Sequence, residues 1–256
     1  MNKFAIAALA ALGAASAWAV QGKITVGSNT MEGQIKWQAR SKAYVVSYKK
    51  GKQTIDMEVK LADKPVLDIA RPNGYDRAVE LVEKGNGAGA IVTLQKIVED
   101  YRMLTWDKPA GRYLVMAHLS AGNAQKAFEI ASGIISDDPS AAYTGELAPA
   151  YWQSLLKLGK TQQLESQLRK ASASADRATS AAALVMRGDV IVAEGGESND
   201  SLKKALTDAY LRVSLMYLDD ECRAVRREAM MKASGCFKKL GQAQRAEQLS
   251  SEAQRL

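Results

Sequence analysis

The side chains best suited to chemistry are few in this sequence. His118 is the only histidine of the 256 residues, and general acid–base catalysis needs partner groups placed around an imidazole. A Ser-x-x-Lys pattern, used by some acyl enzymes together with companion motifs, begins at Ser47, Ser154 and Ser201. The companion motifs are missing, and three matches in one chain show how little this pattern discriminates. The sequence therefore predicts a protein that is not an enzyme.

Metal and disulfide chemistry is equally sparse. The sequence has no second histidine and no Cys/His spacing of the zinc type. The acidic runs at 137–138 and 219–221 could bind calcium weakly, but solvation of helix ends explains them better. Cys222 and Cys236 fall in what reads as mostly one helix, so about 21 Å would separate them, too far for a disulfide. We expect no cofactor, a buried Cys236, and a Cys222 that is either free or an intermolecular link.

The N-terminal stretch has the composition of an export signal. Lys3, the apolar run after it and the small residues on either side of Trp18 match a secretory signal peptide with cleavage near Ala19. The apolar run is too short to span a membrane. We therefore expect residues 1–19 to be a signal peptide, no transmembrane segment, and a mature chain that is periplasmic or secreted.

Residues 20–70 have the pattern of short antiparallel strands. Apolar and polar residues alternate in KITV, MEGQIKW, KAYVVSY and QTIDMEVKL, and turns rich in Gly, Ser and Lys separate these stretches. The lengths of the strands and the spacing of the turns resemble those of an SH3- or Sm-like barrel. Pro72, Asn73 and Gly74 mark the boundary with a second, helical part.

The second part, residues 75–256, is helical in pattern and repeats. Gly85, Gly122, Gly159 and Gly196 follow one another at intervals of 37 residues, and Gly241 comes 45 residues later. A fixed period of this size is typical of stacked helix pairs. Each glycine suits the left-handed residue that ends a first helix. The residue five places after each glycine is small in most repeats, which lets the second helix pack closely against the first. These residues are Ala90, Ala127, Leu164, Ser201 and Ala246.

The repeat around Gly122 resembles a tetratricopeptide repeat. Gly122, Ala127 and Pro139 match the turn glycine, the alanine and the proline of that family, and Gly241 and Ala246 match the first two. The period of 37 differs from the family's 34, and the family's tryptophan and first glycine are missing. The resemblance implies an α+β protein, mostly α, in which a small antiparallel β-barrel precedes a solenoid of helical repeats.

The resemblance also assigns roles to single residues. His118 lies four residues before its turn glycine, as Leu155 and Phe237 do, which implies a packing role inside a helix pair. In the family, residues 10, 6 and 3 before each turn glycine line a partner-binding groove. Here these are Arg112, Met116, Leu119, Pro149, Gln153, Leu156, Met186, Val190, Ala193, Met231, Gly235 and Lys238. The methionines in this set would adapt to varied apolar partners.

These patterns favour non-covalent binding as the function. We expect an exported scaffold that holds a protein or peptide of the cell envelope in its groove and can form homo-oligomers. The net charge of +7 would otherwise suggest nucleic acid, but export argues against such a partner. The alternative is a tether to an anionic cell-wall glycan, such as peptidoglycan, in which basic residues of the barrel bind: Lys36, Arg40, Lys42, Lys49, Lys50 and Lys52. Strong salt dependence of binding would favour that alternative.

Overall fold

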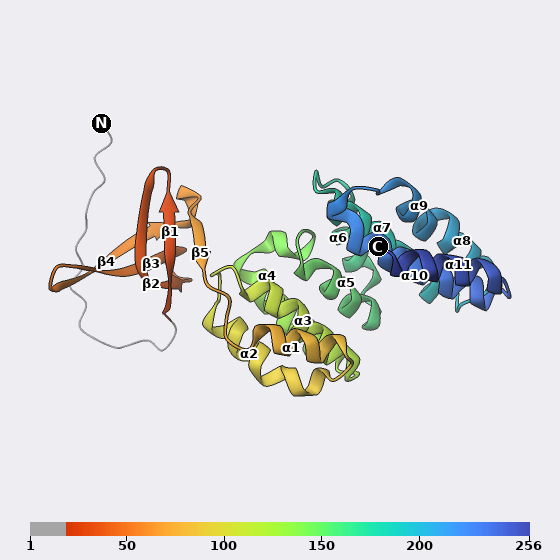
Figure 1. The fold of residues 1–256 in the computed structure, drawn as a ribbon, viewed down its shortest axis with the longest axis horizontal. Helices are drawn as coiled ribbons and strands as arrows, with labels where there is room; N and C mark the ends of the chain where they lie inside the picture. Colours follow the sequence, from red (N-terminus) through yellow and green to blue (C-terminus); the bar gives the residue numbers. More distant parts are fainter. Residues whose placement is uncertain (1–18) are drawn as a thin grey trace. The chain divides into compact units, whose positions relative to one another are not determined.

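The computed structural model describes residues 19–256, so the expected signal peptide lies outside the described residues except for Ala19. An antiparallel sheet comes first and helices follow it (Figure 1). This order confirms the predicted fold class, α+β and mostly α. The chain divides into two compact units, one that ends at Asp138 and one that spans Pro139–Leu256. Among residues 19–256, no helix is both long enough and apolar enough to cross a membrane.

The sheet has five strands in the order β4-β3-β2-β1-β5, with antiparallel neighbours throughout. The strands are β1 (Val20–Val26), β2 (Asn29–Gln38), β3 (Ala43–Lys50), β4 (Gln53–Lys60) and β5 (Val66–Ile69). Alternate residues of a strand point to the same face, and one face therefore collects the buried side chains Ile24, Ile35, Tyr44, Val46, Val59 and Ile69. Closure of this sheet into a barrel stays a prediction.

Two helix pairs complete the first unit. The first pair is α1 (Tyr75–Glu83) and α2 (Ile91–Asp100), and the second is α3 (Asp107–Ser120) and α4 (Ala124–Asp137). The apolar positions of α1, α2 and α3 recur three or four residues apart, which puts them on one face of each helix. They form a single buried cluster that includes Ala78, Val82, Leu94, Ile97, Ala110 and Leu114.

The loop between α2 and α3, residues 101–106, completes the core of the sheet. Met103 and Leu104 are buried in the same cluster as the strand residues. The Tyr44 hydroxyl of β3 donates a hydrogen bond to the Met103 carbonyl oxygen at 3.1 Å. The Trp106 indole donates to the carbonyl of Ile69 in β5 at 3.0 Å. The sheet and the first two helix pairs are thus one unit, although strand gives way to helix at the predicted boundary near residue 74.

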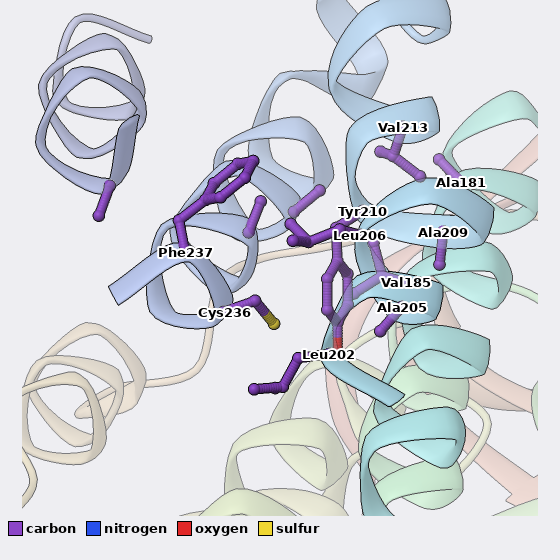
Figure 2. Packing of buried hydrophobic residues seen from close by; sticks show 13 residues of the cluster. Ala181, Val185, Leu202, Ala205, Leu206, Ala209, Tyr210, Val213, Cys236 and Phe237 are labelled. Atoms are coloured by element: carbon purple, nitrogen blue, oxygen red, sulfur yellow. The ribbon is translucent and has the colours of Figure 1, made fainter. Parts of the chain in front are cut away.

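The second unit contains three further helix pairs. Its helices are α5 (Leu147–Lys157), α6 (Thr161–Ser172), α7 (Arg177–Glu194), α8 (Asn199–Ala205), α9 (Leu211–Met216), α10 (Arg223–Lys239) and α11 (Ala243–Gln254). A π-helical turn, Leu206–Tyr210, joins α8 to α9. Figure 2 shows side chains of α7, of the α8–α9 segment and of α10 directed toward one another in the buried core of this unit. The long α8–α9 segment explains why the last interval between turn glycines is 45 residues rather than 37.

The turn glycines perform the predicted role. All five have positive φ, between 59° and 80°, in the left-handed region that glycine adopts without cost. In each turn the residue after the glycine donates its N–H to the carbonyl of the residue five positions earlier, for example Asn123 to His118 at 2.8 Å and Lys160 to Leu155 at 2.9 Å. This bond satisfies a helix-end carbonyl in the Schellman arrangement. The residues five places after the glycines are all buried: Ala90, Ala127, Leu164, Ser201 and Ala246.

Candidate interaction surfaces

His118 lies near the end of α3, beside the α3–α4 turn. Its side chain is half-buried on α3, and its carbonyl accepts the hydrogen bond that closes the α3–α4 turn. Burial lowers the pKa of the imidazole, and the nearby charge of Lys126 lowers it further. In the described part of the chain, its buried Nδ1 has no hydrogen-bond partner. An uncharged imidazole without a positioned donor or acceptor agrees with packing.

The three Ser-x-x-Lys serines occupy structural positions. The buried Ser154 hydroxyl donates to the Tyr151 carbonyl at 2.6 Å, and Ser201 donates to the carbonyl of Ser198 at 2.9 Å. Ser47 lies in β3, where it is the register partner of Asp56 in β4. Hydrogen bonds to local carbonyls are the usual use of serine within helices. The structure therefore gives these serines local roles in the fold.

The acidic run before α10 includes a group of potential metal ligands. Ligand atoms of Asp219, Glu221 and Cys222 lie within 4.8 Å of one another. The Asp219 carboxylate already accepts a hydrogen bond from the Arg177 guanidinium at 2.6 Å, and Asp220 pairs with Arg223 at 2.6 Å. Two of the carboxylates in this run are therefore paired with arginines. This pairing agrees with a structural role at the start of α10.

The two cysteines are free and buried. Cys236 belongs to the apolar core of the second unit, as the sequence predicts. Cys222 has no exposed surface, and burial raises the pKa of its thiol. An intermolecular link through Cys222, one of the two expected alternatives, is therefore wrong for this fold, because a disulfide partner cannot reach the sulfur.

On α3, three predicted groove residues keep part of their surface accessible, and Met116 also packs against the buried cluster of α1, α2 and α3. Arg112, Met116 and Leu119 are all half-buried. The Arg112 guanidinium carbon lies 5.3 Å from the centre of the Tyr113 ring, a cation–π distance. No carboxylate pairs with Arg112 among the described residues. This surface thus offers a guanidinium, a thioether and an isobutyl group within two turns of one helix.

The Tyr113 ring continues into a row of aromatic side chains. Tyr75 lies edge-on to Tyr113, with 6.3 Å between the ring centres, and to Trp106, with 5.2 Å. The Tyr113 hydroxyl donates to the Glu83 carboxylate at 3.3 Å. These contacts come from α1 and α3 and fix the ring beside which Arg112 lies. The Arg112 guanidinium therefore lies beside an aromatic ring that α1 and α3 hold in place.

In the second unit the predicted groove residues separate into accessible and buried ones. Gln153 and Leu156 of α5 are half-buried, while Met231 (47% exposed) and Lys238 of α10 lie in solvent. Of the remaining predicted positions, Pro149 is half-buried, and Ala193 and Gly235 are exposed.

Met186 and Val190 of α7 require a correction. They are only 3% and 6% exposed, so neither can contact a partner in this fold. The positions were carried over as distances from the turn glycine, and these distances do not specify which faces of a helix its neighbours cover. α7 contacts α5, α6, the α8–α9 segment and α10, so both positions fall on packed faces of the helix.

Between these two residues lies a polar group that the sequence did not reveal. The Asp189 carboxylate accepts hydrogen bonds from the Lys232 ammonium, at 2.9 and 2.8 Å, and from the Tyr210 hydroxyl at 2.7 Å. Burial acts to lower the pKa of Lys232, but Asp189 and Glu228 raise it overall. Burial and the charge of Asp189 raise the pKa of Tyr210. The three side chains are hydrogen-bond partners of one another, and they connect α7, the π-helical turn and α10.

Five of the six basic residues of the glycan alternative lie at the two ends of β3, with Lys49 in the same group as Lys50. Arg40 and Lys42 lie in the turn before β3, whereas Lys50 and Lys52 lie at its far end and in the following turn. At 3.3 Å per residue the ends of this strand are about 23 Å apart. Lys36, on β2, faces Val45 of β3. The residues of the glycan alternative therefore do not form one continuous patch.

Comparison with known proteins finds similarity among solved structures. No protein family profile matches the chain, and no curated protein matches it. A protein of Podosopora anserina, described as a kinesin light chain with nearly identical TPR-like repeats, is 14% identical over 71% of this chain and 91% of its own, with a TM-score of 0.41. MamA of AMB-1 is 16% identical over 72% of this chain and 96% of its own, with a TM-score of 0.39.

Proposed function

We propose that this protein is an exported, non-catalytic scaffold that binds another protein or peptide of the bacterial envelope through its helix pairs. The observation that carries the proposal is the accessible surface of α3, where Arg112, Met116 and Leu119 lie together. The export signal in the sequence supports the location. The local structural roles of His118 and of the serines support the absence of catalysis.

The chemistry of this surface suits a peptide. A guanidinium presents five donors in a rigid fork, which bind carboxylates and backbone carbonyls. The Arg112 guanidinium lies 5.3 Å from the centre of the Tyr113 ring and has no carboxylate partner in the described chain. Met116 and Leu119 lie one and two turns further along α3 and can pack against apolar side chains. A segment with an acidic group followed by apolar residues would match both features.

Site-specific cross-linking of the mature chain tests the proposal. A photoreactive residue at Met116 should cross-link one defined envelope protein, whereas the same residue at Val92 on α2, which is 81% exposed, should not. Arg112→Glu should weaken capture of that protein by at least about tenfold, since charge-assisted contacts of this kind contribute roughly 1.5–3 kcal/mol. Arg77→Glu, an equal change of charge on the exposed surface of α1, is the matched control.

Two results would contradict the proposal. One is equal cross-linking from Met116 and Val92, which would show that α3 has no preferred partner. The other is retention on purified cell-wall glycan that depends on the basic turn residues, disappears at high salt and is unaffected by Arg112→Glu. That second result would support the glycan tether instead.

A further inference from the structure

The end of α9 exposes an unusual run of large apolar side chains. Leu215, Met216 and Leu218 are 73%, 59% and 61% exposed. Single exposed apolar residues are ordinary, but three within four positions concentrate exposed apolar surface in one short segment, and such concentrations are found at interaction sites. Neither the repeat pattern nor the proposed groove accounts for this run.

Side chains from two other helices hold the backbone of this run in place. Arg177 of α7 donates to the Met216 carbonyl at 3.2 Å and to the Asp219 carboxylate at 2.6 Å. Arg226 of α10 donates to the Ser214 carbonyl at 3.0 Å. These bonds satisfy the carbonyls that the end of α9 leaves free. The apolar side chains therefore project from a fixed backbone, so little conformational entropy is lost when they are covered.

Opposite charges border the apolar run on its two sides. Arg212 precedes it and lies on the same helix face as Leu215, three residues later. Glu221 follows it, in the turn that leads to α10. Of the two carboxylates between them, Asp219 pairs with Arg177 and Asp220 with Arg223. Arg212 and Glu221 are both exposed, and no ion pair joins either to another described residue.

We propose that the segment from Arg212 to Glu221 binds the same segment of a second copy across a two-fold axis. From its N-terminal end, the segment carries a positive charge, then the apolar side chains, then a negative charge. When two copies run antiparallel, the positive end of each lies opposite the negative end of the other. Arg212 would then face Glu221 of the partner subunit, and the apolar side chains would cover one another. Such an interface, with the same patch on both subunits, is the commonest form of homodimer.

Two alternatives fit the observations less well than this dimer. One is binding of the apolar run to a lipid surface, and the other is association through the last helix, α11. An anionic lipid surface would meet the exposed carboxylate of Glu221, which no arginine of the described residues pairs with, and like charges would repel. Association through the last helix lacks apolar surface, because the buried residues of α11, Ala246 and Ala253, face its own unit and most of the remaining residues are exposed and polar. The dimer goes beyond the proposed function and does not depend on it.

Charge reversal tests the interface. Sedimentation equilibrium of the mature chain, from about 10 µM to about 1 mM, should show a monomer–dimer equilibrium, since a small interface gives a weak complex. Arg212→Glu and Glu221→Arg should each weaken dimerisation by at least about tenfold, as expected when a close ion pair becomes a repulsive pair. The double variant should restore dimerisation, because each subunit again presents opposite charges. Lys203→Glu, on the exposed surface of α8, should have no effect.

Three results of the sedimentation experiments would overturn the proposal. They are a monomer at every concentration, a double variant no better than the single ones, and a dimer that survives Leu215→Ser with Leu218→Ser. Binding to phosphatidylglycerol vesicles that this serine pair abolishes would also overturn it, in favour of a lipid contact. Arg112→Glu should leave the sedimentation profile unchanged, so a failure of the dimer can be told apart from a failure of the proposed groove.

Discussion

Tyr44 joins a strand to a loop that lies 59 residues later in the chain. Its hydroxyl is buried and donates to a backbone carbonyl, and a phenolate could not make that bond. Burial, with smaller contributions from the charges of Asp107 and Asp138, raises the pKa of Tyr44 to about 12. The fold thus holds the phenol proton more tightly than the unfolded chain, where the pKa is 10.0.

This difference predicts how stability falls in alkali. The contribution of Tyr44 is complete below the unfolded pKa of 10.0 and is lost as the pH rises through about 12. Tyr44→Phe should lower the free energy of unfolding by about 1 kcal/mol at neutral pH and should flatten its decline above pH 10. Urea unfolding across this pH range measures both effects. Tyr48→Phe on the same strand is the control, and curves for the two variants that run parallel would contradict the prediction.

Two glycines should respond differently to the same substitution. A Cβ at Gly188 would lie 2.5 Å from Cε1 of Tyr210, the residue whose hydroxyl binds Asp189, whereas a Cβ at Gly122 meets nothing within 4 Å. Gly188→Ala should therefore destabilise the protein by about 1–3 kcal/mol through overpacking, despite the better helix propensity of alanine. Gly122→Ala should cost roughly 1–2 kcal/mol through its left-handed backbone alone.

Double variants with Tyr210→Ala separate the two causes. Removing the ring should relieve most of the added cost of Gly188→Ala and none of the cost of Gly122→Ala. Thermal unfolding of the wild type, the three single variants and the two double variants would show this. An equal response of both glycines would mean that the Tyr210 ring moves away without cost.

Among the elements, the α2–α3 loop connects the sheet to the helices. Leu104 is 1% exposed and lies in the core of the sheet. Leu104→Ala should therefore cost about 2–5 kcal/mol and should accelerate amide exchange in β1–β5 and in α2 and α3 together. Exchange in α5–α11, which belong to the other compact unit, should change little. Faster exchange in the sheet alone would show that the loop does not link the two parts.

The sequence predicted the helices and strands that depend on residues close together in the chain. A left-handed helix end requires glycine, so the repeated glycines gave the helix pairs, and alternation in stretches such as KAYVVSY gave the strands. The α2–α3 loop was missed because its partners in the sheet lie more than 30 positions away along the chain. One signal was present, since Met103, Leu104 and Trp106 are unusually apolar for a short helix connection. Apolar residues in a short loop indicate that the loop is buried against another part of the fold.

The predicted groove shows the limit of a register carried over from a repeat. Distances from the turn glycine placed Arg112, Met116 and Leu119 on accessible surface, because α3 ends in the turn that most resembles the family's. The same distances failed at Met186 and Val190, which are buried because α7 packs against several neighbouring helices. The spacing fixes where a first helix ends, but the packing of neighbouring helices fixes which of its faces stays exposed.

At the scale of the whole molecule, the compact units do not follow the change from strand to helix. The division falls between Asp138 and Pro139, inside the repeats, and the sheet shares a unit with the first two helix pairs. A fragment that starts after the sheet would leave Met103 and Leu104 without the strand residues that bury them. Binding experiments on this protein are therefore better done with point variants of the mature chain than with fragments cut at residue 70.

The position of the α2–α3 loop in the chain has a consequence for biogenesis. A ribosome extends a chain by about 5–20 residues per second, so roughly 3–12 s pass between the synthesis of Tyr44 and that of its acceptor Met103, 59 residues later. Until then the strands lack Met103 and Leu104, which are buried in the same cluster as the strand residues. If the chain is exported as we propose, it must stay unfolded until it has crossed the membrane. An N-terminal sheet whose core stays incomplete until Leu104 has been made is suited to that requirement.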